Sequence, residues 1–378
     1  MQVRYFFTYI PDCSTLRYHH EVFKVYFAII QRRTQVKCAK LTGTGTLEIQ
    51  ETPEPQLAPG QILVAMKAVG ICGSDIHYYT AGRIGSEQCR YPQTLGHECA
   101  GVVVKSFKGS KVREGTRVAI EPALPCMKCE ICITGHYNCC PNVKFLGSPG
   151  MPGAFQELLP VDVMQVEEIP DDMSFDEAAV LEPLGVAYHT VELAGIQPGQ
   201  SVAVFGAGAI GLLTLAMFKV CGAGETFIFD TLQYRLDIAR RLYKADHVIN
   251  VNGTDPLEYI RTMTKGRGVD ITCEAAGQPQ TFQWSFEAAR IRGAAYIIGI
   301  PGVDSISFNP HTMRRKELLI RNVRRSNLAL KPCIDLVDRG MLRIGELATH
   351  HFTLDRIKDA FDLASGYRDG AVRAIITA

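Results

Sequence analysis

The sequence predicts an α/β protein in which a β-rich domain is combined with a doubly wound parallel sheet covered by helices. At 378 residues the chain is longer than a single hydrophobic core usually holds. Short β-like runs punctuated by glycine and proline dominate up to about Val180, whereas strand and helix signals alternate from Ser201 onward. We expect four segments: an extension of unknown role (1–36), the β-rich domain (37–185), the parallel-sheet domain (186–325) and a return to the first domain (326–378).

The individual elements follow from apolar periodicity and from the residues that begin and end each run. Ser174 and Glu177 have the spacing of a capping box and predict a helix across Asp176–Gly195, which Pro183 should kink or break. The remaining predicted elements are strands Gln61–Ala68, Gly101–Lys105, Arg117–Ile120, Phe155–Leu159, Ser201–Phe205, Thr226–Phe229, His247–Ile249, Val269–Cys273 and Ala294–Ile298, with helices Ala209–Cys221 and Tyr234–Tyr243.

Composition argues against nucleic acid and membranes as partners. The 40 basic and 39 acidic residues nearly cancel, so no overall charge attracts nucleic acid or an anionic bilayer. No apolar run approaches the roughly 18 residues of a membrane-spanning helix. The 13 cysteines are odd in number, and no convincing secretory signal precedes them. We therefore expect a cytoplasmic, reducing setting, in which clustered cysteines bind metal rather than form disulfides.

A glycine-rich turn predicts a dinucleotide site. Gly206, Gly208 and Gly211 stand at the end of a predicted strand and the start of a predicted helix, in the order Gly-Ala-Gly-Ala-Ile-Gly. The first glycine makes the turn, the second admits a pyrophosphate, and the third lets the helix approach the strand. Asp230 ends the next strand, where its carboxylate can bind the ribose hydroxyls of NAD and repel the 2′-phosphate of NADP. Arg235 leaves NADP open as an alternative.

A cluster of cysteines predicts a structural zinc site. Cys126, Cys129 and Cys132 are spaced three apart, and Cys140 follows eight positions later. Four thiolates in so short a loop can surround one tetrahedral ion and exclude water, which is typical of structural zinc. Cys139 is adjacent to Cys140, so the identity of the fourth ligand stays open at this point.

A second, dispersed set of ligands predicts a catalytic zinc site. Cys72 lies in Gly-Ile-Cys-Gly-Ser-Asp-Ile-His, His97 and Glu98 lie in Gly-His-Glu, and Glu182 lies in Leu-Glu-Pro. Together they offer a thiolate, an imidazole and carboxylates, with one coordination position left for water or substrate. Such an open site is what catalytic zinc requires.

From Lys37 to the C-terminus these motifs resemble the zinc-dependent medium-chain dehydrogenases, and within them the sorbitol/xylitol (polyol) dehydrogenases. The resemblance implies a GroES-like catalytic domain interrupted by a Rossmann domain, and a homo-oligomer, either a dimer or a tetramer. The matching segments are 70–77, 96–101, the cysteine cluster, the glycine turn, and the polyol-type segments 77–85, 181–184 and 322–327.

The resemblance also implies roles for single residues. Cys72, His97 and Glu98 match catalytic zinc ligands. Glu182 matches a carboxylate that reaches the metal directly or through water. Ser74 and His77 match a proton relay. The remaining matches are Tyr78 and Arg324 for substrate, Gly206, Gly208, Ile210, Gly211, Asp230 and Arg235 for the adenosine and pyrophosphate part of NAD, and Ile298, Ile300 and Val323 for the nicotinamide.

The expected activity is reversible oxidation of a secondary alcohol of a polyol to the ketose, with hydride transfer to NAD. Alternatives are another secondary alcohol (threonine, an inositol-type ring or a sugar-alcohol phosphate) and, from another class, a non-catalytic zinc-ribbon binding protein. Arg325 stands where many relatives carry tyrosine, and Arg314, Arg315, Lys316 and Arg321 are nearby in sequence. A solvated basic helix face is the favoured interpretation of these charges. A pocket for an anionic sugar is the alternative.

Overall fold

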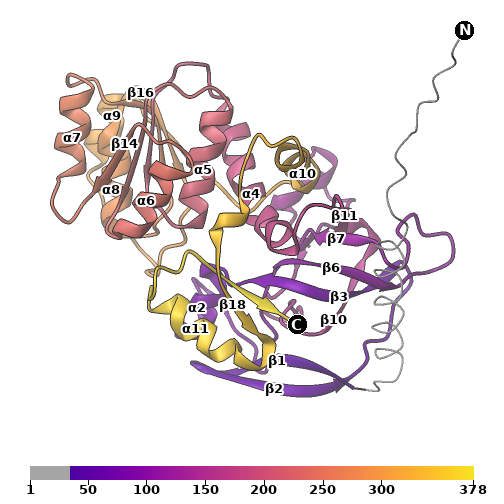
Figure 1. Ribbon diagram of the computed structural model, residues 1–378. Coiled ribbons are helices and arrows are strands. Elements are labelled where there is room, and N and C mark those ends of the chain that lie inside the picture. Colours follow the sequence, from indigo (N-terminus) through magenta and orange to yellow (C-terminus); the bar gives the residue numbers. More distant parts are fainter. Residues whose placement is uncertain (1–34) are drawn as a thin grey trace, which may run out of the picture.

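The computed structural model describes residues 35–378, so all but the last two residues of the predicted extension lie outside the described part. Figure 1 shows a β-rich lobe formed by the first and last parts of the chain and a second lobe formed by its middle part. Every helix among the described residues is too short or too polar to cross a bilayer.

The β-rich lobe is built on a seven-stranded sheet in the order β11-β7-β6-β3-β19-β18, with β10 also pairing with β3. The last strand, β19, lies antiparallel to β3, with Ile375 opposite Gly70, so the end of the chain returns to the first lobe. The strands of this lobe are β1 (Gln35–Gly43), β2 (Thr46–Pro53), β3 (Gln61–Gly70), β4 (Arg83–Ile84), β5 (Glu87–Gln88), β6 (Glu98–Lys105), β7 (Arg117–Ile120), β8 (Ala123–Leu124), β9 (Lys144–Phe145), β10 (Leu158–Asp162), β11 (Val166–Glu168), β18 (Ala348–Thr353) and β19 (Arg373–Thr377).

Short helices and 3₁₀ turns lie between the strands of this lobe in the sequence. They are α2 (Gly73–Ala81), α3 (Glu130–Ile133), α11 (Ile357–Ser365) and the 3₁₀ turns Tyr137–Cys139, Val163–Gln165, Gly345–Leu347 and Leu354–Arg356.

The second lobe is a six-stranded sheet in the order β14-β13-β12-β15-β16-β17, and every neighbouring pair is parallel. The first strand of the unit lies in the middle, which is the doubly wound order, and ligands of such sheets bind beyond the carboxyl ends of the central strands. The fold class predicted from the sequence is confirmed. The elements are β12 (Val202–Phe205), α5 (Ala209–Val220), β13 (Thr226–Asp230), α6 (Gln233–Arg241), β14 (His247–Asn250), α7 (Pro256–Met263), β15 (Val269–Glu274), α8 (Pro279–Ala288), β16 (Ala289–Ile297), α9 (Pro310–Lys316), β17 (Leu319–Asn322) and α10 (Leu330–Asp338).

Helix α4 (Phe175–Ala194) lies between the lobes and packs on strands of both (Figure 1). Its capping box forms as predicted, because Glu177 N donates to Ser174 Oγ at 3.1 Å and Ser174 N donates to Glu177 Oε2 at 2.9 Å. The helix continues through Pro183, so the predicted break is wrong. The helix there is buried on both sides of the proline, and this packing compensates for the lost backbone hydrogen bond.

The strand predicted at Phe155–Leu159 is also displaced, since β10 begins at Leu158. The preceding residues bond to other segments instead: Phe155 N donates to Leu95 O at 3.0 Å, and Ala39 N donates to Phe155 O at 2.8 Å. An apolar run marks burial, but it does not say which backbone will pair with it.

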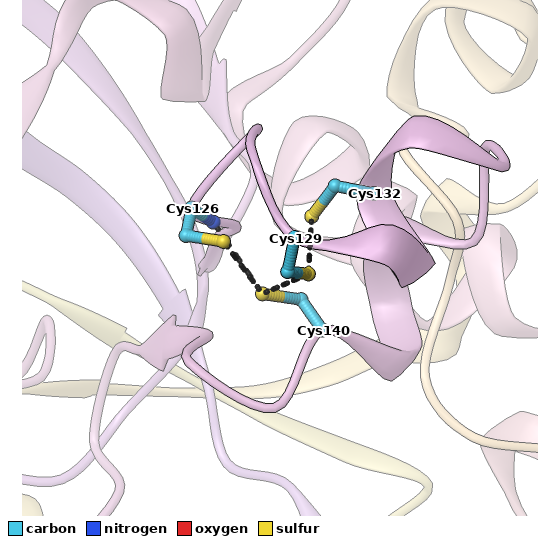
Figure 2. Close-up of side chains that lie close together, drawn as sticks. All are labelled: Cys126, Cys129, Cys132 and Cys140. Carbon is cyan, nitrogen blue, oxygen red and sulfur yellow. Dashed lines mark hydrogen bonds between the residues drawn. The ribbon is translucent and has the colours of Figure 1, made fainter.

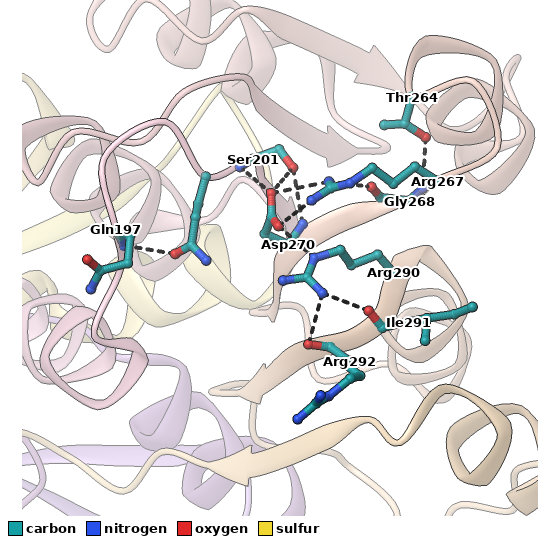
Figure 3. A network of polar contacts seen from close by, with 10 residues as sticks. Gln197, Ser201, Thr264, Arg267, Gly268, Asp270, Arg290, Ile291 and Arg292 are labelled. Carbon is teal, nitrogen blue, oxygen red and sulfur yellow. Dashed lines mark hydrogen bonds and ion pairs between the residues drawn. The ribbon is translucent and has the colours of Figure 1, made fainter.

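A buried carboxylate connects the strands of the parallel sheet at their amino ends (Figure 3). Asp270 Oδ2 accepts from the backbone and hydroxyl of Ser201 at 2.9 and 2.8 Å. Its Oδ1 accepts from Arg267 and Arg290, each at 2.7 Å. Burial opposes ionisation, but these hydrogen bonds outweigh it and lower the pKa of Asp270.

Candidate active site and metal centres

Cys72, His97 and Glu98 come together at one end of the β-rich lobe. One ligand atom from each lies within 4.8 Å of the others, although the cysteine is separated from the other two by more than 20 residues of sequence. Cys72 precedes α2, and Glu98 begins β6, so a helix start and a strand start place them. A thiolate, an imidazole and a carboxylate at this separation match the ligand types and the number of an open zinc site.

Asp75, which was not among the predicted site residues, contacts two members of this cluster. Its carboxylate accepts from Cys72 N at 3.0 Å and from Gly96 N at 3.1 Å, and it lies 3.5 Å from His97 Nδ1. The other ring nitrogen, Nε2, lies 3.4 Å from Ser74 Oγ. A carboxylate on one nitrogen of a histidine fixes the ring and leaves the other nitrogen free for a metal.

Glu98 is buried beside Arg373 of β19. Arg373 Nη1 lies 3.0 Å from Glu98 Oε1, and only 1% of the Glu98 side chain and 5% of the Arg373 side chain are exposed. Neither carboxylate oxygen of Glu98 has a well-aligned hydrogen bond among the described residues. A Cβ at Gly70 would lie 2.5 Å from Glu98 Oε2, so glycine makes room for this acid. A buried carboxylate with free acceptor capacity fits a cation at this position.

Glu182 lies on α4 and lines a cavity that Cys72 and His97 also line. It is not part of the tight three-residue cluster. Burial raises the pKa of Glu182 to about 7, and the negative charge of the neighbouring Glu98 contributes to this rise. A second buried acid, Glu121, accepts from Ala123 N at 3.3 Å and from Ser326 Oγ at 3.4 Å. Burial, followed by Glu182, raises the pKa of Glu121 to about 8. Buried acids are therefore concentrated around Glu182, and a nearby cation would stabilise their charged forms.

The cysteine cluster forms as the spacing predicted (Figure 2). Cys129 and Cys132 sulfurs are 3.5 Å apart, Cys129 and Cys140 3.8 Å, and Cys126 and Cys140 3.5 Å. A regular tetrahedron with zinc–sulfur bonds of about 2.3 Å has sulfur–sulfur edges of about 3.8 Å, so the four sulfurs fit zinc. Cys140 is buried in this group and Cys139 is exposed, which identifies the fourth sulfur.

Backbone groups around the cluster favour the thiolate. N–H groups of Lys128 and Cys129 point at the sulfur of Cys126 and lower its pKa to about 6. All four sulfurs are used by the cluster, which leaves no position for a substrate and suits a structural ion.

One cavity of about 1100 Å³ lies between the two lobes and joins the open metal cluster to the glycine turn. Ser74, His77 and Tyr78 line it from α2. The hydroxyl of Ser74 contacts His97, and His77 contacts the backbone of Ile300. Burial lowers the pKa of His77, so its ring is neutral near pH 7. The other predicted site residues on this cavity are Gly206, Gly208, Ile210, Asp230, Arg235, Ile298, Ile300, Val323 and Arg324.

Two of the three glycines of the turn, Gly206 and Gly211, are required by the lack of space for a side chain. A Cβ on Gly211 would lie 1.8 Å from Gly206 O, and one on Gly206 would lie 2.9 Å from Ala276 N. Gly208 precedes α5, and the nearest atom to its Cβ position is 3.9 Å away, on Arg235. The first and third glycines therefore permit backbone packing, and the second leaves the start of the helix open to a phosphate.

Asp230 lies at the end of β13 beside this turn. Its carboxylate accepts from Ala207 N at 2.6 Å and from Leu232 N at 2.8 Å. Arg235 Nη1 lies 3.9 Å from Asp230 Oδ2, and its guanidinium lies 4.9 Å from the centre of the Tyr367 ring. The cavity is therefore lined by both a carboxylate and a guanidinium near the glycine turn. The fold and this cavity define a protein that holds a dinucleotide beside an open metal site.

The comparisons with known proteins agree with a dinucleotide site beside a metal site. Residues 58–171 match the model of the alcohol dehydrogenase GroES-like domain, and residues 209–339 match that of the zinc-binding dehydrogenases. The chain belongs to the zinc-binding dehydrogenases. It is 36% identical over 344 residues to a sorbitol dehydrogenase of Bacillus subtilis (strain 168), covering 90% of this chain and 97% of the relative. It is 33% identical over 329 residues to a probable D-xylulose reductase A of Aspergillus clavatus, and the match covers 85% of this chain and 91% of the relative.

Among solved structures, an Escherichia coli oxidoreductase/dehydrogenase of unknown specificity, involved in membrane biogenesis, superposes with a TM-score of 0.85 at 31% identity. The match covers 91% of this chain and 99% of that structure. Membership of a dehydrogenase family does not favour the predicted alternative of a non-catalytic zinc-ribbon protein.

Proposed function

We propose that this chain is a zinc-dependent polyol dehydrogenase that interconverts a secondary alcohol of a sorbitol- or xylitol-type polyol and the corresponding ketose with NAD. The observation that carries the proposal is the cavity that Cys72 and His97 of the metal cluster line together with the glycine turn. The names of the relatives, a sorbitol dehydrogenase and a probable D-xylulose reductase, support the substrate class. The carboxylate of Asp230 supports NAD over NADP.

We propose the following roles for the residues of the cavity. A zinc ion at Cys72, His97 and Glu98 would lower the pKa of an alcohol hydroxyl, and NAD would accept the hydride. Ser74 Oγ would accept the hydroxyl proton as its own proton leaves through the ribose of the bound nicotinamide toward His77. His77, neutral because of burial, would take up that proton and pass it toward solvent.

The remaining site residues position the reactants. Glu182, outside the tight cluster, holds a water molecule or the substrate hydroxyl rather than replacing a ligand. Tyr78 and Arg324 contact the polyol. Ile298, Ile300 and Val323 hold the nicotinamide by backbone and apolar contacts, and the lobes on either side exclude water from the reacting atoms.

The test compares Cys72→Ala with Cys221→Ala, an exposed cysteine at the end of α5. We expect Cys72→Ala to lose NAD reduction with sorbitol and xylitol, and to lose the cluster's zinc, while it retains NAD binding and the zinc at the four cysteines. Cys221→Ala should behave as the parent. Turnover that survives in Cys72→Ala would disprove the metal mechanism. A panel with ribitol, galactitol, inositols, threonine and polyol phosphates separates the polyol proposal from its alternatives.

We further propose that the enzyme is a cytoplasmic homo-oligomer. Its catalytic domain would comprise residues 37–185, its NAD-binding domain residues 186–325, and residues 326–378 would return to the catalytic domain. Edge strand β17 supports self-association, because all four of its residues are exposed, with Leu319 at 54% and Ile320 at 38%. The strand that pairs with this exposed edge would be β17 of a second copy of the chain. Ile320→Lys should then shift the mass in solution toward the monomer. The free thiols of the 12 described cysteines support a reducing compartment.

A further inference from the structure

Asn138, in the loop that carries the four cysteines (126–140, the cysteine loop), contacts two distant segments of the chain. It lies in the 3₁₀ turn Tyr137–Cys139 and is 4% exposed. Its Nδ2 donates to Arg324 O at 2.8 Å and lies 3.2 Å from Nε2 of His189 on α4. The two hydrogens of one buried amide group therefore serve segments that are 186 and 51 positions away.

One of these segments, which follows β17, forms part of the wall of the central cavity. Val323 and Arg324 both line the cavity. Val323 N donates to Ile297 O at 2.8 Å, so the start of the segment is tied to β16. The carbonyl of the next residue, Arg324, is bound by the side chain of Asn138 instead. The position of Arg324 therefore depends on the cysteine loop.

Two more hydrogen bonds join the cysteine loop to this segment through Asn327. Asn327 Nδ2 donates to Gly135 O at 2.9 Å, and Asn327 Oδ1 accepts from Asn138 N at 3.4 Å. A short loop whose sulfurs surround one metal ion has little conformational freedom. The cysteine loop can therefore act as a fixed support for the segment that it contacts.

The backbone of the supported segment needs such a support. Arg325 and Leu328 have φ of 55° and 56°, in the left-handed region that residues with a Cβ seldom adopt. Conformations of this kind persist only where the surroundings impose them. Ser326, between the two, packs closely on α4, since a Cβ on Gly185 would lie 3.0 Å from Ser326 Cβ. Packing on α4 and the hydrogen bonds from the cysteine loop together impose the conformation.

We propose that Asn138 is a positioning residue for the substrate side of the active site, and that it acts through the backbone of Arg324. Asn138 lies behind the cavity wall and is not among the residues that line the cavity. Loss of its donor would free the Arg324 carbonyl and let the arginine side chain move relative to the polyol. This inference rests on the proposed polyol dehydrogenase function and gives the cysteine loop a part in substrate binding.

The test compares Asn138→Asp with Cys139→Ala, which changes an exposed side chain in the same turn. Aspartate keeps the shape of asparagine but has no amide hydrogens, so Arg324 O loses its donor. We expect Asn138→Asp to raise KM for sorbitol and xylitol about 3- to 10-fold, the usual effect of one lost hydrogen bond. The kcat and the Kd of NADH should stay within about twofold, because the metal ligands and the proton relay lie on other elements. Cys139→Ala should match the parent.

A second measurement follows the segment itself. Amide hydrogen exchange over residues 322–330 should be faster in Asn138→Asp and in Asn138→Leu than in the parent, and exchange in β15 should be unchanged. Asn138→Leu removes the donor without adding a charge, and both variants should retain the zinc of both metal sites. Asn327→Ala, at a half-buried position, removes the other two hydrogen bonds and should raise the same KM and the same exchange rates. It provides the test if the Asn138 variants do not fold.

The outcomes are separable. Unchanged KM and unchanged exchange over residues 322–330 in folded variants would overturn the positioning role and leave the polyol dehydrogenase intact. Faster exchange throughout the protein, together with loss of zinc from the four cysteines, would also overturn it, because Asn138 would then only stabilise its own loop. No turnover of any alcohol by parent protein that binds zinc and NAD would overturn the proposed function itself. The exchange measurement would still decide whether Asn138 fixes the segment.

Discussion

Arg373→Met tests whether the last strand supports the open metal site. The guanidinium lies 3.0 Å from Glu98 Oε1 and donates to Ile71 O at 2.8 Å, with only 5% of its side chain exposed. Methionine keeps the apolar stem and removes the charge, so Glu98 is left as a buried acid without a counter-ion. Breaking such a pair costs about 3–5 kcal/mol of unfolding free energy. Loss of a group that supports a metal ligand weakens zinc binding about 10- to 100-fold.

The assay follows zinc content and urea unfolding with and without chelator. We expect Arg373→Met to release the zinc of the open site at lower chelator concentration and to retain that of the four cysteines, since Arg373 is not among the residues around them. Zinc should restore part of the lost stability, because the cation replaces the missing charge beside Glu98. Arg113→Met, at an exposed arginine, is the matched control. Equal stability and equal zinc retention in the two variants would refute the argument.

Two other predictions concern the parallel-sheet lobe. Gly211→Ala should weaken NADH binding, followed by fluorescence, about tenfold or more, because a Cβ 1.8 Å from Gly206 O forces the turn apart and overpacking costs about 1–3 kcal/mol. Gly253→Ala, where the Cβ meets open space, should have no effect. For Asp270 the lowered pKa means that its stabilisation is present above the unfolded value of about 3.9 and is lost as pH falls below it. Unfolding of the parent should therefore show a steeper loss below about pH 4 than Asp270→Asn, and parallel profiles would contradict the assignment.

Features encoded in short stretches of sequence were predictable. The glycine turn and the cysteine cluster each lie within a loop or one strand–helix unit, so spacing alone specifies their geometry. Only the choice between Cys139 and Cys140 needed the structure, which buries one and exposes the other. The break at Pro183 was predicted wrongly, because a local rule about proline does not include the packing of both lobes on α4.

Features that depend on distant segments were not predictable in the same way. The resemblance to known dehydrogenases suggested Cys72, His97 and Glu98, but nothing in the sequence marked Asp75 as the residue that orients them. Arg325 could be noticed as an unusual charge, yet its guanidinium lies 3.8 Å from the centre of the ring of Phe145, which is 180 positions away in the chain.

The position of β19 explains why the metal site and the completed fold are linked. Ile71 N donates to Ala374 O at 3.0 Å, and Arg373 donates back to Ile71 O, so the strand at the chain's end is bonded to the residue just before Cys72. The same strand supplies the only counter-ion that Glu98 has among residues 35–378. Before β19 docks, Glu98 lacks this counter-ion, and the segment that leads to Cys72 lacks its backbone partner. The surroundings of the open site are therefore complete only when the last strand is in place, whereas the four cysteines lie within one short stretch of the chain.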